Sequence, residues 1–399
     1  MATQPIDLKD DRSAFQASST TIRSLAPHRP DHIDIPVALP RLPTTDCITP
    51  YLRQIDQNRW YTNQGPLCDA LQDRLGQFWG VGYERVALVT NATTGLSLAL
   101  RAHGIPAGTR CLMPSWTFTA SAAAVVGANL RPHFVDVCPA TWCPDPARIE
   151  HLAKADDVGA IFIVAPFGAP LDLDLWDGIA ERTGRPVIID AAAAFDTLRD
   201  HGPMRPRCST IVVSLHATKV FGLGEGGAVL THDTALAEHV RTLARFGFAG
   251  SRLAQYPAMN AKISEYTAAV GLAGLDYWKP TRARWRNVTE LYRRALPSSV
   301  MLPPDFGNNW VSATLTAICP TDAGPVTGYL ATHGVQTVSW WGTGCHTQPA
   351  YADCTRDPLP VTEDYGRCSV GLPFWQDLSA EQITYVCNLL NEALKLGNT

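Results

Sequence analysis

Short apolar segments alternate with segments of helical length along the middle of the chain. Between Pro66 and Gly80, leucine and phenylalanine recur at every third or fourth position, which predicts a helix. Six apolar runs that are typical of strands follow it: RVALVT (85–90), CLM (111–113), HFVDV (133–137), AIFIVAP (160–166), VIID (187–190) and TIVVSL (210–215). Most of them are separated by stretches long enough for a helix. This alternation predicts a mainly parallel sheet with helices on both faces.

The pattern beyond Lys279 indicates a smaller α/β unit. It predicts, in order, a helix through Leu296, a strand over 311–319, a helix and a strand between 325 and 338, and a helix from about Ser379 to Lys395. We therefore expect a large domain over 34–277 and a small C-terminal domain over 278–399. The first 33 residues are polar and aperiodic, a composition that cannot bury enough surface to order itself alone, so we expect a polar arm there.

Composition excludes several classes of protein. The 399 residues are 46% hydrophobic and carry a net charge of −4, which gives no basic field for DNA or RNA. The longest apolar stretches fall far short of the roughly 20 residues that span a bilayer, and the polar start MATQPIDLKDDR has no signal-peptide core. The eleven cysteines are scattered without a CxxC pair, which argues against a disulfide framework and against a zinc site. We expect a cytoplasmic protein with no membrane, nucleic-acid or metal partner.

The clearest chemical signal is formed by three polar residues at the ends of predicted strands. Asp190 ends VIID, and Ser214 and Lys219 follow the next strand in SLHATKVFGLGEGG. Because the carboxyl ends of parallel strands converge on one crevice, these side chains are expected to face a common ligand. A desolvated lysine can bind a carbonyl group covalently, and an aspartate can pair with the protonated ring nitrogen of pyridoxal phosphate. The sequence therefore indicates a site for this cofactor.

Two further segments suit the same ligand. After the strand RVALVT, Thr93 and Thr94 open a predicted helix, and a helix N-terminus with free amides and hydroxyls binds phosphate. The segment PSWTFTAS (114–121) follows the strand CLM and places Trp116 or Phe118 where an aromatic ring could stack on a planar cofactor. The default position of either aromatic ring is the core, so both interpretations stay open for each.

At these residues the chain resembles the DegT/StrS-like sugar-nucleotide aminotransferases, which belong to the fold type I pyridoxal-phosphate enzymes. The resemblance covers about residue 35 to the C-terminus. In order, it rests on WYTNQGP (60–66), TNATTGL (90–96), PSWTF (114–118), FVDV (134–137), IIDAAA (188–193), SLHATK (214–219), GEGG (224–227), NAKISEYTAAVGL (260–272), GCHTQPAY (344–351), LPVTED (359–364) and GLPFWQDLS (371–379). It implies a three-layer α/β/α large domain with a mainly parallel seven-stranded sheet, and a small C-terminal α/β domain.

The resemblance also implies roles around the cofactor. Lys219 would bind the cofactor covalently and transfer protons, and Asp190 would keep the ring nitrogen protonated. Phe118 would stack on the ring. The residues that would hold the phosphate are Thr93, Thr94 and Ser214, joined by Asn260 from the neighbouring subunit of a homodimer with shared active sites.

The implied reaction is amino transfer from L-glutamate to a ketosugar nucleotide, namely a dTDP- or GDP-linked 4-keto-6-deoxyhexose, for surface polysaccharide or a secondary metabolite. Lys262 stands where many relatives have arginine and is a candidate for the donor carboxylate or the nucleotide diphosphate. His346 matches a family histidine near the sugar site. Tyr61 and Asn63 of the WYTNQGP loop are further candidates for substrate contact.

Two positions depart from the family pattern. Ala193 replaces a glutamine that touches the cofactor, and Val338 replaces an arginine. Three alternatives to amino transfer stay open: a sugar dehydratase, a non-catalytic regulatory protein with the same fold, and a binding protein without covalent chemistry. The departures at Ala193 and Val338 favour only the regulatory protein. In the dehydratases a histidine replaces the lysine, so Lys219 favours amino transfer.

Individual residues also have purely structural interpretations. Asp190 could cap a helix over the alanine run that follows it, and Asn260 could cap a helix beginning near Ile263. His216, three residues before Lys219, could be catalytic or could pack against the end of the sheet.

Overall fold

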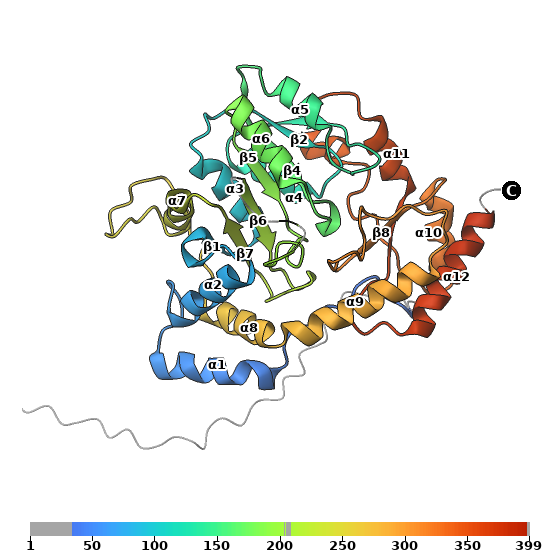
Figure 1. The fold of residues 1–399 in the computed structure, drawn as a ribbon, viewed down its shortest axis with the longest axis horizontal. Helices are drawn as coiled ribbons and strands as arrows, with labels where there is room; N and C mark the ends of the chain where they lie inside the picture. Colours follow the sequence, from blue (N-terminus) through green and yellow to red (C-terminus); the bar gives the residue numbers. More distant parts are fainter. Residues whose placement is uncertain (1–33, 203, 205–208, 397–399) are drawn as a thin grey trace, which may run out of the picture.

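The computed structural model describes residues 34–202, 204 and 209–396 (Figure 1). Its main sheet has eight strands in the order β1-β7-β6-β5-β4-β2-β3-β9. The strands are β1 (Val86–Val89), β2 (Arg110–Pro114), β3 (Arg131–Val135), β4 (Val158–Val164), β5 (Val187–Asp190), β6 (Thr210–Ser214), β7 (Gly227–Leu230) and β9 (Thr355–Arg356). Only β7 runs antiparallel to its neighbours, β1 and β6. The predicted, mainly parallel sheet is confirmed, with one strand more than expected because β9 pairs with β3 at the edge.

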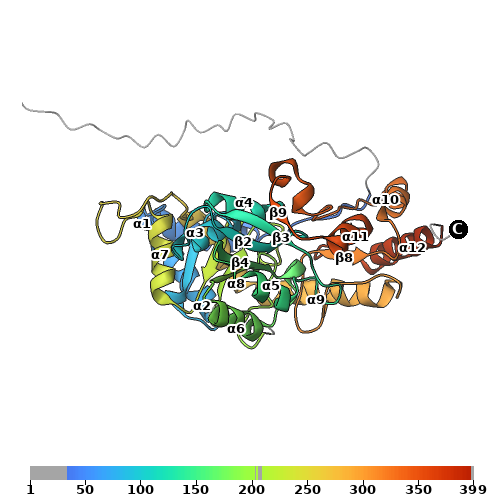
Figure 2. The ribbon, with the colours of Figure 1, turned by 90° about the horizontal axis from the view of Figure 1, so that it is seen from above.

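Helices cover both faces of this sheet, as the sequence pattern predicts (Figures 1 and 2). They are α1 (Thr45–Asn58), α2 (Pro66–Phe78), α3 (Ala92–Ala102), α4 (Thr119–Gly127), α5 (Pro146–Leu152), α6 (Leu173–Thr183), α7 (Thr234–Ala244) and α8 (Glu265–Asp276). Successive strand residues point to opposite faces, so Ile188 and Ile189 belong to different core clusters. One cluster joins the sheet to α2, α5, α6 and α8, and the other joins it to α3, α4 and α7. The three layers are thereby confirmed.

The C-terminal elements lie beside the β2–β3 side of the sheet (Figure 1). They are α9 (Trp278–Ala295), α10 (Ala323–Thr332), α11 (Pro360–Cys368), α12 (Ala380–Leu396) and an antiparallel pair, β8 (Leu315–Ile318) with β10 (Ser369–Leu372). Single-turn 3-10 helices occur at Tyr83–Arg85, Pro166–Gly168, Cys345–Thr347 and Pro349–Tyr351. The strand expected before residue 338 is wrong. Val335 and Val338 make only isolated bridges, to Ile35 and to Gly371 of β10, because each of the two residues pairs with a different segment at a single position.

The division into a large and a small domain remains a prediction. Strand β9 belongs to the C-terminal part but extends the main sheet, and Ile35 bridges to Val335, so contacts cross the expected boundary in both directions. The expected arm over 1–33 lies outside the described residues.

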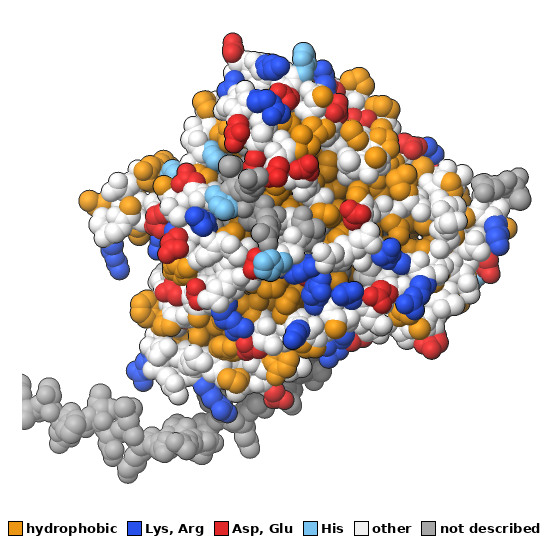
Figure 3. All heavy atoms as spheres, viewed as in Figure 1, with side chains coloured by type: hydrophobic (Ala, Val, Ile, Leu, Met, Phe, Trp, Pro, Cys, Tyr) orange, Lys and Arg blue, Asp and Glu red, His pale blue; other side chains and the backbone are white. Residues whose placement is uncertain are grey.

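Helix α9 carries a distinct charge pattern. It buries Trp285, Val288 and Tyr292, while Arg286, Arg293 and Arg294 are exposed on its outer side. Figure 3 shows Lys and Arg side chains gathered over this part of the molecule, although the chain as a whole is slightly acidic.

Among the described residues, no helix combines the length and the apolar character needed to cross a membrane. The ten cysteines in this part of the chain are all free, and seven of them are buried.

Candidate active site

The carboxyl ends of β1, β5 and β6 lie at one edge of the sheet, where the sequence predicts the site. Asp190 is the last residue of β5 and Ser214 the last residue of β6. Ser214 pairs with Gly227, the first residue of β7. A Cβ atom on Gly227 would lie 2.8 Å from the backbone nitrogen of Ala92, so only glycine lets this strand approach the start of α3 so closely. The end of β6 and the N-terminus of α3 are therefore neighbours.

The first turn of α3 offers a cradle for an anion. Thr93 and Thr94 lie in this turn, and the side-chain oxygen of Asn91 caps the helix by accepting a hydrogen bond from the Thr94 N–H at 2.8 Å. The remaining amides, the threonine hydroxyls and the positive end of the helix dipole favour a phosphate. Ser214 adds a hydroxyl whose oxygen accepts a bond from the His216 N–H at 3.3 Å. Thr93, Thr94 and Ser214 thus gather as predicted.

Asp190 is buried, with 6% of its surface exposed, and both of its carboxylate oxygens have partners. Oδ2 accepts a hydrogen bond from the Ser121 hydroxyl at 2.7 Å, and Oδ1 accepts one from the Ala192 N–H at 3.0 Å. Burial raises the pKa of Asp190, and the two hydrogen bonds and the charge of Lys219 act against that rise. The alternative interpretation of Asp190 as a helix cap is wrong, because residues 191–200 form turns and a bend.

Lys219 follows β6 and sits in the field of Asp190. Burial lowers the pKa of its ammonium group, and the Asp190 carboxylate acts in the opposite direction. A lowered pKa increases the fraction of neutral amine, which is the form that attacks a carbonyl carbon. His216 points into its own turn instead: its Nδ1 bonds to the Thr218 hydroxyl at 2.8 Å, and its Nε2 lies 3.5 Å from the Glu225 carboxylate. These contacts all lie within residues 216–225, and 42% of the side chain is exposed, so His216 is not packed against the end of the sheet.

The two aromatic candidates have opposite environments. Phe118, the residue before α4, leaves 55% of its surface exposed, whereas Trp116 leaves 1%. Trp116 makes edge contacts with Trp341 and Tyr365 at centroid distances of 4.9 and 5.1 Å, and Trp341 stacks on Phe167 at 4.0 Å. Trp116 is a core residue. Phe118 is the aromatic side chain that remains available to a ligand.

His346 is buried and bound to the segment after β2. Its backbone N–H donates to the Ser115 hydroxyl oxygen at 3.2 Å, and its Nδ1 lies 2.7 Å from the same oxygen. Burial lowers the pKa of His346, followed by the effect of the Arg356 charge, so the neutral ring is favoured. Because PSWTFTAS also carries Phe118 and Ser121, His346 is tied to the segment that supports Asp190.

Tyr61 and Asn63 lie in an exposed loop that is far in sequence from Asp190 and Lys219. The Tyr61 carbonyl accepts the backbone N–H of Glu265 at 3.0 Å, and its ring stacks with Tyr266 at 6.3 Å. Asn63 has a positive φ of 63°, which asparagine tolerates better than most residues. In the described part of the chain, no hydrogen bond or ring contact joins either residue to Asp190 or Lys219, so their substrate role stays a prediction.

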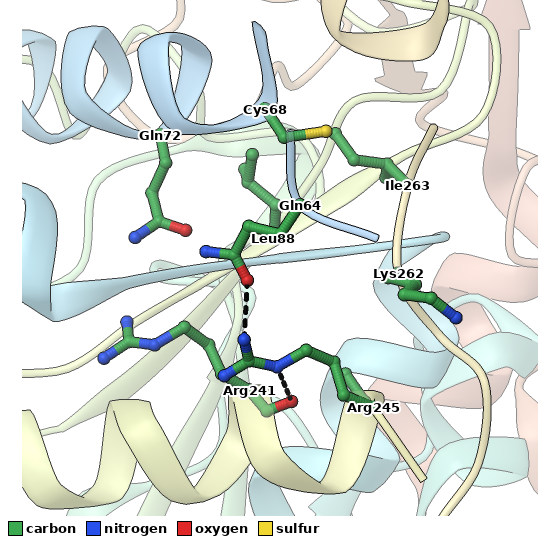
Figure 4. A pocket seen from close by; sticks show the side chains of 9 residues that line it. Gln64, Cys68, Gln72, Leu88, Arg241, Arg245, Lys262 and Ile263 are labelled. Atoms are coloured by element: carbon green, nitrogen blue, oxygen red, sulfur yellow. Dashed lines mark hydrogen bonds between the residues drawn. The ribbon is translucent and has the colours of Figure 1, made fainter. Parts of the chain in front are cut away.

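Lys262 borders a small basic pocket together with Gln64, Arg241 and Arg245 (Figure 4). The Gln64 side-chain oxygen accepts a bond from the Arg245 guanidinium at 3.0 Å, whereas the Lys262 amine points away from both arginines. That amine lies 4.7 Å above the Phe246 ring and donates to the side chain of Asn260.

Asn260 is exposed and does not cap α8. The cap is Ser264, whose hydroxyl oxygen accepts the Thr267 N–H at 3.1 Å. The capping interpretation is therefore wrong, and the side chain of Asn260 remains at the surface with Lys262.

Sequence reasoning missed two groups of site residues. One is the pair Ser121 and Thr117, whose hydroxyl groups connect to Asp190. Both residues lie inside PSWTFTAS, the segment that the sequence connects with the cofactor only through Trp116 and Phe118. The other is the pair Arg241 and Arg245: Arg241 lies in the last turn of α7, and Arg245 directly follows the helix.

These residues fit pyridoxal phosphate on the evidence of the structure itself. The helix N-terminus and Ser214 match the phosphate, the exposed Phe118 ring matches the pyridine face, and the buried Asp190 carboxylate matches the ring nitrogen. Lys219 supplies the amine. A buried carboxylate and a desolvated lysine at neighbouring strand ends of a parallel sheet suit an enzyme that uses this cofactor.

Comparison with known proteins agrees with this class. The sequence profile of the DegT/DnrJ/EryC1/StrS aminotransferase family matches residues 44–391, and the chain belongs to this family. It is a pyridoxal-phosphate-dependent aminotransferase.

Three similar proteins illustrate the relationship. The chain is 30% identical to Protein Rv3402c of Mycobacterium tuberculosis over 96% of this chain and 95% of that protein. It is 34% identical to the dTDP-4-amino-4,6-dideoxy-D-glucose transaminase of Shigella dysenteriae over 67% of this chain and 72% of that enzyme. The crystal structure of DesI in the presence of its TDP-sugar product superposes with a TM-score of 0.81 at 28% identity, covering 92% of this chain and 94% of that one.

Proposed function

We propose that the protein transfers the amino group of L-glutamate to a keto sugar carried on a nucleotide diphosphate, with a dTDP- or GDP-linked 4-keto-6-deoxyhexose as acceptor. The observation that carries the proposal is the placement of Asp190 at the end of β5 and of Lys219 after the neighbouring strand β6, in a chain that resembles a dTDP-amino-sugar transaminase and a structure solved with a TDP-sugar. A GDP-perosamine synthase of Escherichia coli O157:H7, 27% identical over 90% of this chain and 98% of that one, supports the GDP alternative.

Different residues of this chain have different roles in the proposed reaction. When bound, pyridoxal phosphate supplies an electron sink for the carbanion at the α carbon of the amino donor. Lys219 removes the proton from that carbon with its neutral Nζ, which burial favours. Asp190 holds the charge on the ring nitrogen, and Phe118 lies against the ring face. Thr93, Thr94 and Ser214 bind the phosphate.

Substrate recognition is assigned to polar groups around this centre. Lys262 presents an ammonium group to the donor carboxylate or the nucleotide diphosphate, and the pocket arginines beside it add positive charge. His346, held by Ser115, is assigned to the sugar, and Tyr61 and Asn63 of the WYTNQGP loop are assigned to further substrate contacts.

We further propose a homodimer in which Asn260 reaches the phosphate bound by the neighbouring subunit. The exposed ring of Phe246, 4.7 Å from the Lys262 amine, supports this, as do the exposed rings of Tyr61 and Tyr266, which stack on each other. Exposed aromatic side chains are typical of an interface between subunits.

The test is amino transfer in two separate steps. The purified protein loaded with pyridoxal phosphate is mixed with L-glutamate, and the visible absorbance of the lysine-bound cofactor and the release of 2-oxoglutarate are followed. The aminated protein, freed of glutamate, is then mixed with dTDP- and GDP-4-keto-6-deoxyhexoses, and the nucleotide-linked amino sugar is detected by mass spectrometry.

Lys219→Ala is the control for both steps, because it removes the amine that binds the cofactor. We expect glutamate to abolish the absorbance of the wild-type protein and the variant to show no such band. If glutamate leaves the wild-type spectrum unchanged, the donor assignment is wrong; if neither keto sugar is aminated, the acceptor assignment is wrong.

A further inference from the structure

Two buried hydroxyl groups connect the segment after β2 to Asp190. The Thr117 Oγ1 and Ser121 Oγ atoms lie 2.9 Å apart, and Ser121 Oγ lies 2.7 Å from Asp190 Oδ2. Thr117 leaves 2% of its surface exposed and Ser121 none, so water has no access to replace either bond. Neither residue belongs to the set that binds the cofactor directly.

The chemistry of these groups fixes the direction of the chain. An ionised carboxylate only accepts hydrogen bonds, so the single O–H of Ser121 is committed to Asp190. The Ser121 oxygen therefore accepts from Thr117, and every proton in the chain points toward the carboxylate. Hydrogen bonds aligned in this way polarise one another. Protonation of Asp190 would remove the requirement for this direction.

The chain also leaves Asp190 with free acceptor capacity. A carboxylate has about four lone-pair positions. Ser121 occupies one of them and the Ala192 N–H occupies another, on the opposite oxygen. Both oxygens are thus held in place while lone pairs remain for a third donor. A protonated ring nitrogen is such a donor, and its positive charge complements the carboxylate.

We propose that Thr117 and Ser121 are positioning residues whose hydroxyl chain keeps the buried Asp190 carboxylate ionised and oriented toward the ring nitrogen of the cofactor. This inference rests on the role proposed above for Asp190. Burial acts against ionisation of this carboxylate, and Lys219 is the charged group among the described residues that acts on it from the neighbouring strand end. The hydroxyl chain adds to the effect of Lys219 without carrying a charge.

The experiment measures binding of pyridoxamine phosphate to the apoprotein by fluorescence titration over a range of pH. This form of the cofactor has no aldehyde and cannot bond covalently to Lys219, so its affinity reports the contacts of the ring and the phosphate. We expect Ser121→Ala to weaken binding about tenfold near neutral pH, equivalent to about 1.4 kcal/mol, because the carboxylate loses one of the hydrogen bonds that favour its ionised form. The loss of binding on acidification should begin at a higher pH than in the wild type, because Asp190 protonates more readily.

Three further variants separate positioning from packing. Thr117→Val removes the outer hydroxyl, does not touch Asp190, and should weaken binding severalfold in the same pH-dependent way. Ser121→Thr keeps a hydroxyl and should restore most of the affinity. Ser97→Ala removes a buried hydroxyl on α3 that faces α4 without touching Asp190, and should bind like the wild type.

The outcomes distinguish this inference from the proposed function. If Ser121→Ala and Thr117→Val bind pyridoxamine phosphate with the affinity and pH dependence of the wild type, the hydroxyl chain has no positioning role, while the aminotransferase assignment stands. A uniform loss of affinity at all pH values, with no rescue by Ser121→Thr, would also refute the inference. If Ser121→Ala does not fold, Thr117→Val alone decides. Failure of the wild-type apoprotein to bind the cofactor would overturn the proposed function together with the inference.

Discussion

Replacing Asp190 with asparagine should stabilise the apoprotein and weaken cofactor binding. The substitution keeps the size of the side chain and can keep both of its hydrogen bonds. The amide oxygen can accept the Ala192 N–H, and the amide NH2 can donate to Ser121, whose hydroxyl then turns toward Thr117. What changes is the charge. The perturbation therefore isolates the carboxylate from the packing around it.

The expected stabilisation follows from the pKa of Asp190. Burial raises this pKa above its value in the unfolded chain, even with Lys219 nearby. The stabilising contribution of the group is therefore fully present below the unfolded pKa and is lost as the pH rises through the folded pKa. At neutral pH the ionised carboxylate is a net cost, and each pKa unit corresponds to about 1.4 kcal/mol. We expect Asp190→Asn to raise the free energy of unfolding of the apoprotein at pH 7, with no gain near pH 3.

The same substitution, Asp190→Asn, should weaken binding of the cofactor although it stabilises the apoprotein. A charge-assisted hydrogen bond to the ring nitrogen is worth about 1.5–3 kcal/mol, so the affinity for pyridoxamine phosphate should fall roughly 10- to 150-fold. Thermal unfolding of the apoprotein at pH 3 and pH 7, together with the binding titration, measures both effects on the same samples. Asp136→Asn is the control. Its carboxylate accepts bonds from the backbone of Val361 and Thr362, away from the cofactor residues, so this variant should lose stability.

A less stable Asp190→Asn apoprotein at pH 7, or unchanged affinity for the cofactor, would refute this reasoning. General misfolding would lower stability and affinity together. The predicted opposite signs exclude that explanation.

Two other substitutions test the structural assignments. Phe118→Ala should weaken pyridoxamine phosphate binding up to about tenfold and leave thermal stability nearly unchanged, because the ring is mostly exposed in the apoprotein; a large drop in melting temperature would instead make Phe118 a core residue. Glu265→Gln should cost about 1–3 kcal/mol in urea unfolding without a specific effect on cofactor affinity, because its buried carboxylate accepts the N–H groups of Leu67 and Cys68 at 2.8 and 2.9 Å at the start of α2. Equal stability of this variant and the wild type would contradict the capping role.

The elements were predictable where one period of hydrophobic residues dominates. The helix after Pro66 and the six strands predicted from apolar runs appear close to their predicted positions. Buried strands in a parallel sheet are continuously apolar, which makes them recognisable in the sequence. The prediction of strands failed where pairing with a neighbouring segment, and not the hydrophobic period, decides whether a strand forms. Strand β9 has two exposed residues and exists only because the chain passes beside β3, whereas the segment before Val338 has a strand-like sequence but only isolated partners.

The sequence by itself indicated the main candidates for the chemistry. Asp190, Ser214 and Lys219 each follow a strand, and the geometry of a parallel sheet brings such residues together whatever the details of packing. The sequence left open which of two neighbouring aromatic residues is available to the cofactor. Trp116 and Phe118 are equally apolar in composition, and only the tertiary structure buries one and exposes the other.

The environment of those residues was decided by the tertiary structure alone. Ser121 supports Asp190 across 69 positions of the chain, and His346 meets Ser115 across 231. No local pattern encodes such contacts, because hydrogen bonds between distant segments depend on how the helices and strands pack. The same packing desolvates Asp190 and Lys219 and moves their pKa values in opposite directions. A sequence can show that a carboxylate and an amine are present, but the removal of water that makes them reactive is a property of the folded chain.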